Sequence, residues 1–222
     1  MAFPFTENFN GLTDGDLNGQ NGWSTIAGGW HSFVVNTTWK YEGTKGARWI
    51  DASNTFNGAC QKSFTTLTGS GHVYIAVYWV STTDLNIVLG GWRIDVNRLT
   101  ANAILLAGGA NRTIGSSLSA STWYLVDVEY DIDADTVRGR YHNGTSWSSY
   151  TATTTAGTAA SKIEIYVNNN TTGGAAVDLI TGTNPFTSGP ANLKTYNTNP
   201  LANIKTINTN VIANVKTLDT NA

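Results

Sequence analysis

The chain contains one cysteine, Cys60, in 222 residues, and little charge of either sign. A single thiol can neither close an internal disulfide nor build a thiolate metal site, which excludes a disulfide-stapled scaffold. Lys and Arg number 13 and Asp and Glu 15, so the net charge of −2 argues against a basic nucleic-acid binder. No apolar run approaches a membrane span, and the N-terminus lacks the basic and apolar regions of a secretory signal. We therefore expect a protein made without a secretory signal that inserts into no membrane.

Aromatic residues and glycine are abundant instead, with 8 Trp, 9 Tyr, 7 Phe and 23 Gly. Hydrophobic residues make up 41% of the chain, enough to supply a core at this length. Residues 1–183 alternate short β-branched and aromatic runs with Gly, Asn, Asp and Ser, which is typical of many short strands. The sequence predicts an all-β fold, an antiparallel jelly-roll β-sandwich, over residues 1–183.

Three strands stand out by composition. Residues 72–80 are nearly continuous in apolar and aromatic side chains, which indicates a central strand covered on both faces. Residues 85–89 and 92–96 are expected to be its neighbours, joined to each other across a turn at Gly90-Gly91.

A hairpin is predicted from residues 122–132 and 137–142, with 133–136 as its loop. The alternation of charge and hydrophobicity favours one register, because a one-residue slip would drive the carboxylates into the core. That register pairs Asp131 with Arg138, Glu129 with Arg140 and Asp127 with His142 on one face, and Ile132 with Val137 and Val128 with Tyr141 on the other.

Two acidic loops raise the question of calcium. The pattern Asp131-x-Asp133-x-Asp135 resembles the start of an EF-hand loop, but Thr136 stands where the pattern needs glycine and His142 where it needs glutamate. Turn chemistry explains these aspartates, and it also explains the acidic loop at 13–19. We expect no cofactor and no metal site, with calcium in one of these loops as the alternative.

Catalytic residues are not predicted. The three histidines are isolated from one another, and no serine lies in a nucleophile elbow. A glycosidase would need two facing carboxylates, for which Glu129 and Glu164 are the strand residues to nominate. Most tryptophans are expected in the core. Trp23 and Trp147 are the ones we single out for stacking on sugar rings, which present apolar C–H faces.

The last forty residues change character. Pro185, Gly189 and Pro190 mark a linker at 184–190, after which an eleven-residue repeat fills residues 191–222, with copies that begin Ala-Asn-(Leu/Ile/Val)-Lys-Thr. An eleven-residue period also suits supercoiled helices, but Asn-Thr-Asn and the β-branched residues favour a strand and turn per copy. Units this short cannot bury an apolar face alone and need a stacking partner. The contacts we expect there are apolar, with lysines facing solvent or acidic groups: Leu193, Ile204, Ile207, Ile212, Val215 and Leu218, with Lys194, Lys205 and Lys216.

Two resemblances are carried by these residues. Segments 5–23, 122–131 and 166–180 resemble strands and loops of concanavalin A-like, laminin-G-type jelly rolls, a match that covers residues 3–183. That fold implies no single function, because such sandwiches serve as lectins, glucanases, adhesion modules and virion appendages. The repeat is similar to C-terminal repeats of bacteriophage structural proteins, in which Asn-Gly often occupies the turn that is Asn-Thr here.

These resemblances imply a non-enzymatic virion structural protein of a bacteriophage, of the decoration or fibre kind. Its repeat tail would dock onto the capsid or another virion component and join copies, with a homotrimer expected, so its location would be the virion. A glycan-binding adhesion module for host attachment is the alternative hypothesis. A glucanase-like hydrolase is a third.

Overall fold

The structure is a computed structural model of the chain, and it describes residues 3–26, 33–51, 58–80, 83–97, 102–107, 110–169 and 173–186. Residues 1–184 form one compact unit. All regular elements in the described ranges are strands, and no helix long and apolar enough to cross a membrane occurs among these residues.

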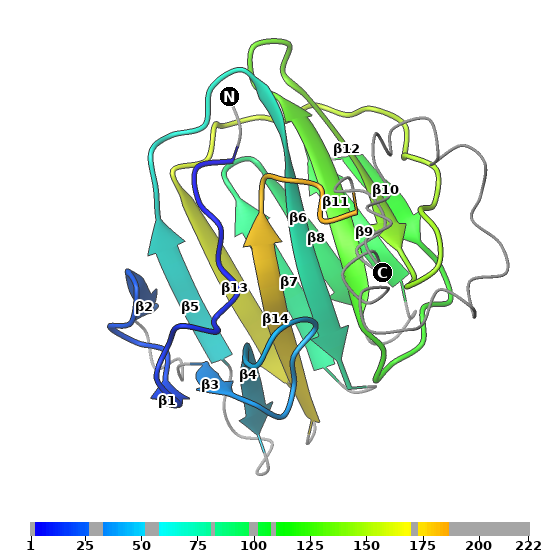
Figure 1. Cartoon of the computed structure of the whole chain (residues 1–222). Coiled ribbons are helices and arrows are strands. Elements are labelled where there is room, and N and C mark those ends of the chain that lie inside the picture. The colour runs from blue at the N-terminus through cyan, green and yellow to red at the C-terminus, as the bar shows by residue number, and fades with distance from the viewer. Residues whose placement is uncertain are drawn as a thin grey trace, which may run out of the picture. The chain divides into compact units, whose positions relative to one another are not determined.

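Two antiparallel seven-stranded sheets lie one behind the other (Figure 1). Sheet A has the order β1 (Gly15–Asp16), β3 (Val34–Asn36), β4 (Gly46–Asp51), β14 (Gly173–Thr181), β6 (Ser70–Trp79), β11 (Tyr124–Asp131), β12 (Thr136–His142). Sheet B has the order β10 (Ala110–Gly115), β9 (Asn102–Ala107), β8 (Trp92–Asn97), β7 (Thr83–Leu89), β13 (Lys162–Asn169), β5 (Gly58–Ser63), β2 (Trp23–Thr25). The predicted all-β sandwich is confirmed.

The core lies between the sheets and is formed by alternate residues of each strand, as the two-residue period of a strand requires. In β7, for example, every second side chain from Thr83 to Leu89 is buried. The prediction that most tryptophans lie in the core holds for four of the eight, each at most 3% exposed: Trp23, Trp49, Trp79 and Trp92.

Strand β6 is central, as predicted, because it pairs with β14 on one side and β11 on the other. The hairpin of β7 and β8 across Gly90-Gly91 is also confirmed. Gly90 has φ +56°, and a Cβ there would lie 2.1 Å from the carbonyl oxygen of Thr158, so the turn requires glycine. The expectation that β7 and β8 neighbour β6 is wrong. The chain changes sheet between β6 and β7, a crossover that local pattern does not encode.

The β11–β12 hairpin is present with the predicted faces, but its register is displaced by two residues. Asp127 pairs with Arg140 and Glu129 with Arg138, while His142 lies opposite Leu125. The loop comprises residues 132–135, because the carboxylate of Asp131 accepts the Ala134 N–H and Asp135 adopts φ 51°. A displacement by an even number of residues keeps every side chain on its face, so charge alternation alone does not separate the two registers.

Residues 187–222 lie outside the described ranges, and so does most of the predicted linker. The nine repeat residues nominated for anchoring therefore lie outside the described residues as well: Leu193, Lys194, Ile204, Lys205, Ile207, Ile212, Val215, Lys216 and Leu218.

Candidate functional site on the outer face of sheet A

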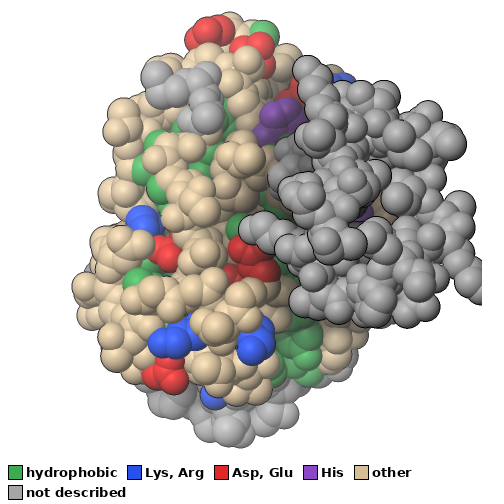
Figure 2. Space-filling model, viewed as in Figure 1, with side chains coloured by type: hydrophobic (Ala, Val, Ile, Leu, Met, Phe, Trp, Pro, Cys, Tyr) green, Lys and Arg blue, Asp and Glu red, His purple; other side chains and the backbone are tan. Residues whose placement is uncertain are grey.

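The outer face of sheet A gathers aromatic and charged side chains from strands that are distant in sequence. On β6, alternation places Val73, Ile75 and Val77 in the core and turns Tyr74 and Ala76 to the opposite face, where they pack in a second apolar cluster. Figure 2 shows that hydrophobic side chains reach the surface on one side of the molecule between charged groups of both signs. This face combines the two features that a binding surface for a polar, partly apolar ligand needs.

Four half-buried aromatic rings form a continuous row, which we call the aromatic band: Trp39, Tyr78, Trp123 and Tyr41. The ring centroids of Trp39 and Tyr78 are 5.0 Å apart, those of Tyr78 and Trp123 5.3 Å, and those of Trp123 and Tyr41 5.9 Å. These distances lie in the range of favourable aromatic pairs. At the far end the guanidinium of Arg48 lies 5.9 Å from the Trp39 ring.

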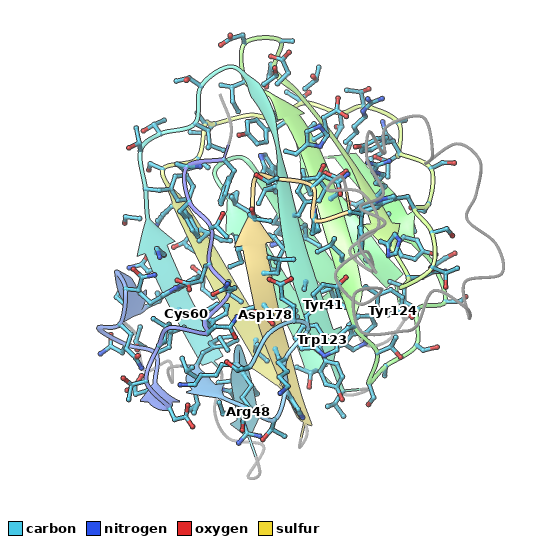
Figure 3. The ribbon with its side chains drawn as sticks, viewed as in Figure 1. Tyr41, Arg48, Cys60, Trp123, Tyr124 and Asp178 are labelled. Atoms are coloured by element: carbon cyan, nitrogen blue, oxygen red, sulfur yellow. The ribbon has the colours of Figure 1, made fainter. Side chains whose placement is uncertain are left out.

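The position of Tyr41 depends on a buried carboxylate. Asp178 Oδ2 accepts the backbone N–H groups of Tyr41 (2.9 Å) and Glu42 (3.1 Å), and Oδ1 accepts that of Leu179. Figure 3 shows Tyr41, Trp123 and Asp178 gathered in front of β14 and β6. Burial outweighs these three bonds and raises the pKa of Asp178 to about 6. The carboxylate thus fixes the loop that carries Tyr41 over the sheet.

A second aromatic group, built around Trp147, lies further along the same face. The Trp147 ring is 5.1 Å from His142 and 6.0 Å from Tyr74, centroid to centroid. The guanidinium of Arg140 lies over both Trp147 (4.4 Å) and Tyr150 (4.2 Å), which are favourable cation–π distances. Arg140 therefore positions Trp147 over β12.

Asp127 is the electrostatic centre of this second group. It is 0% exposed, and it accepts hydrogen bonds from Arg140 Nε (2.8 Å) and the Tyr150 hydroxyl (2.7 Å). The Nδ1 atom of His72 lies 2.9 Å from Asp127 Oδ1. Three partners satisfy the buried carboxylate, as a buried charge requires.

The ionisable groups near Asp127 respond to it. The hydrogen bond to Asp127 raises the pKa of His72 above its ordinary value, although burial acts in the opposite direction. Burial, aided by the same carboxylate, raises the pKa of Tyr74 to about 12 and that of Tyr150 still further. Both phenols are neutral at physiological pH and serve as hydrogen-bonding groups.

The carboxylates nominated for hydrolysis do not face each other. Glu129 lies on β11 of sheet A, whereas Glu164 lies on β13 of sheet B, and each has its own cation. Both Glu129 carboxylate oxygens accept from Arg138 Nη2, at 3.0 and 2.9 Å, and Glu164 accepts from Lys162 at 2.7 Å. The Glu129–Glu164 pair is therefore excluded as a catalytic pair. Asp127 and Glu129 do share a face, but both already hold arginines.

A shallow hollow of about 120 Å³ lies at the tip of the β11–β12 hairpin. It is lined by Glu129, Tyr130, Asp131, Thr136, Val137, Arg138 and Thr153. Small-molecule sites usually enclose 300–1,000 Å³ and bury most of their ligand. This hollow is too small for that mode, so the aromatic surface is the better candidate site.

The acidic loops use their carboxylates in turns. Asp131 accepts the Ala134 N–H, and Asp135 accepts the Gly157 N–H at 2.8 Å. In the loop at 13–19, Asp14 pairs with Lys45 at 2.9 Å and Asp16 accepts the Asn18 N–H. No group of three or more His, Cys, Asp or Glu suited to a metal occurs among the described residues.

The structure separates the two tryptophans nominated for sugar stacking. Trp23 is 1% exposed, and its indole N–H donates to the buried Glu7 carboxylate at 3.0 Å, so this prediction is wrong. Trp147 is half-buried on the outer face of sheet A. Sequence reasoning missed the aromatic band and the partners of Asp127. The even spacing of Tyr74 and Tyr78 along one strand indicated that their side chains share a face. Trp39, Tyr41 and Trp123 lie outside regular strands, so strand alternation could not place them.

The sequence matches no family model and no curated protein. Several solved structures are similar in fold. The cellulose induced protein Cip1 has 10% identity and a TM-score of 0.57, over 79% of this chain and 95% of that one. A Bacillus licheniformis beta-glucanase has 13% identity and a TM-score of 0.54, over 82% and 98%. The T. cruzi calreticulin globular domain has 11% identity and a TM-score of 0.54, and the match covers 80% of this chain and 86% of that one. At such identities the likeness bears on architecture alone, and the compact unit of this chain shares with these structures an antiparallel jelly-roll β-sandwich.

Proposed function

We propose that this protein binds glycans on the outer face of sheet A. The observation that carries the proposal is the row of half-buried rings, Trp39, Tyr78, Trp123 and Tyr41, continued by Trp147 on the same face. Sugar rings present apolar C–H faces that pack on aromatic rings, and their hydroxyls need hydrogen-bonding groups nearby. The polar side chains around Asp127 and Glu129 provide such hydrogen-bonding groups on the same surface.

Binding without hydrolysis is the form of this activity that the carboxylates support. A glycosidase needs one carboxyl group that can donate a proton and a second that can act as base or nucleophile. Asp127 is fully buried beneath three partners, and Glu129 holds Arg138 through both oxygens. Neither carboxylate is available to a sugar without first losing an arginine. We therefore propose a binding protein rather than an enzyme.

The test is a glycan array with full-length protein and two variants, Trp123→Ala and Trp147→Ala. We expect binding of the wild type, and weaker binding of each variant by roughly three- to tenfold, as the loss of one aromatic contact implies. Tyr166→Ala is the matched control, because Tyr166 is a half-buried aromatic residue on β13 of the opposite sheet. An equal loss in the control, or no binding by the wild type, would refute the proposal.

A second proposal concerns the repeat tail, and its support is the eleven-residue period of residues 191–222. We propose that the chain is a virion structural protein of a bacteriophage, whose tail docks onto the capsid or another virion component and joins copies into trimers. Repeats too short to bury an apolar face alone can bury it by associating with other copies or with another protein. Glycan binding by the sandwich would then serve host attachment.

Sedimentation of the full chain and of a chain ending at residue 184 tests this second proposal. We expect trimers of the full chain and monomers of the shorter one, which retains the whole compact unit. Virions assembled in the presence of the shorter chain should not carry that chain. Normal occupancy of the truncated protein on virions would overturn the anchoring role without affecting glycan binding.

A further inference from the structure

We propose that the ligand is an internal stretch of an uncharged, extended polysaccharide that lies along β6 and β11 and contacts Trp123 and Trp147 at the same time. This inference rests on the proposed glycan binding and adds the class of ligand and its direction on the sheet. It follows from the spacing of the two tryptophans, the apolar cluster that they cover and the pairing of the charges around Asp127.

The two tryptophans are separated along the strands. Trp123 contacts Tyr78, and Trp147 contacts Tyr74, which is four residues away on the same strand. Four residues of β-strand span about 13 Å, which is longer than one sugar ring. We call the rings of Trp123 and Trp147 the two platforms, and this span suits a run of about two to three linked sugar units between them. A single terminal sugar would therefore reach one tryptophan only.

The two tryptophans rest on a buried apolar cluster that aromatic side chains cover. Ala76 pairs with Leu125 across β6 and β11, and both are 0% exposed. Tyr41, Trp123 and Trp147 all pack against the cluster that contains these two residues. A ligand that reaches from Trp123 to Trp147 would therefore lie on these covering rings rather than on Ala76 or Leu125.

The charged groups nearest Trp147 are paired with one another. Arg140 bonds Asp127 at 2.8 Å, and Arg138 bonds Glu129 at 2.9 Å. His72, the third basic group here, lies 2.9 Å from Asp127. An anionic sugar would have to compete with a carboxylate for each of these cations, whereas the hydroxyls of a neutral sugar do not. Around Trp147 the pairing therefore favours an uncharged ligand.

Calorimetry with oligosaccharides of increasing length tests the inference. The probes are gluco-, manno-, galacto- and xylo-oligosaccharides of one to six units, with polygalacturonate and hyaluronan as anionic polymers. For the series that binds, we expect affinity to rise by at least tenfold from two units to about four or five, the length that reaches both platforms, and then to level off. In Trp123→Ala and in Trp147→Ala this dependence on length should disappear, and in the control Tyr166→Ala it should persist.

The outcomes separate the inference from the proposed function. Binding of a mono- or disaccharide as tight as that of a hexasaccharide would overturn the two-platform ligand and leave glycan binding intact. Tighter binding of the anionic polymers, weakened by 0.5 M salt, would overturn its neutrality. No binding of any probe by the wild type would refute glycan binding itself, and the inference with it.

Discussion

The buried carboxylate of Asp127 provides the sharpest energetic prediction. Asp127→Asn keeps the shape of the side chain and removes its charge. The Tyr150 hydroxyl can still donate to the remaining amide oxygen, but Arg140 loses the carboxylate that faces it at 2.8 Å. The substitution therefore leaves a guanidinium without its counter-charge in a largely buried position.

The loss of folding stability in Asp127→Asn follows from how deeply the ion pair is buried. Removing one partner of a buried ion pair costs about 3–5 kcal/mol, and Asp127 is 0% exposed. The Arg140 side chain is 21% exposed and can turn partly to water, which favours the lower end, about 3 kcal/mol. For a domain of this size that corresponds to a fall in Tm of about 6–12 °C.

Glu129→Gln is the matched control, because it removes the same kind of charge from the neighbouring pair on the same two strands. Its side chain is 33% exposed and that of Arg138 is 40% exposed, so the loss should be about 0–1 kcal/mol. Urea unfolding of both variants at pH 7 measures the difference. NMR titration should show the pKa of His72 lowered more in Asp127→Asn than in Glu129→Gln, because the hydrogen bond to Asp127 is the largest cause of its rise and the charge of Glu129 a smaller one. Equal destabilisation of the two variants would refute the argument that burial gives the Asp127 cluster its strength.

Two further predictions concern pH and a turn. Because the pKa of Asp178 is raised to about 6, the native state binds a proton that the unfolded state lacks between about pH 4 and 6, so stability falls as pH rises through that window. The raised pKa of His72 acts in the same sense above pH 6.5, and Asp178→Asn should flatten only the lower part of the urea-unfolding profile, by about 3 kcal/mol. Gly90→Ala should cost about 2–4 kcal/mol in the same assay because its Cβ would meet a carbonyl oxygen, whereas Gly144→Ala, with φ +92° and open space, should cost about 1 kcal/mol. Equal losses at the two glycines would show that backbone strain alone sets the cost.

The hairpin shows how far local sequence determines structure. Alternation of charged and apolar residues gave both strands and both faces correctly, because the side-chain period of a strand is two. It did not give the register, because the choice between two loops depends on whether Asp131 ends a strand or caps a turn. The bond from Ala134 N–H to Asp131 decides that choice, and either register would have satisfied the arginines.

Other parts of the site depend on contacts that no local pattern encodes. Asp178 holds the backbone of Tyr41, 137 residues earlier in the chain, and the Glu7 carboxylate accepts from Lys62 and from the Trp23 indole. The sequence contains nothing near Trp23 to indicate that a carboxylate from the N-terminal segment would bury it. The wrong prediction for Trp23 follows from this, since burial of a tryptophan with its N–H satisfied needs a distant partner.

The outer face of sheet A was nevertheless partly implicit in the sequence. The hairpin pattern placed Asp127 and Glu129 on the outward face, and the observed pairing of β11 with β6 puts Tyr74 and His72 beside them on that face. Only the identity of the neighbouring strand was missing, and the incorrect choice of β7 as the neighbour of β6 concealed it. Because cross-strand neighbours share a face, a single non-local pairing turns a known outward row of charges into a known outward row of aromatic residues. The strand order therefore places Tyr74 and Tyr78 on this face, whereas Trp39, Tyr41 and Trp123 lie outside the strands and depend on loop contacts such as that of Asp178 with Tyr41.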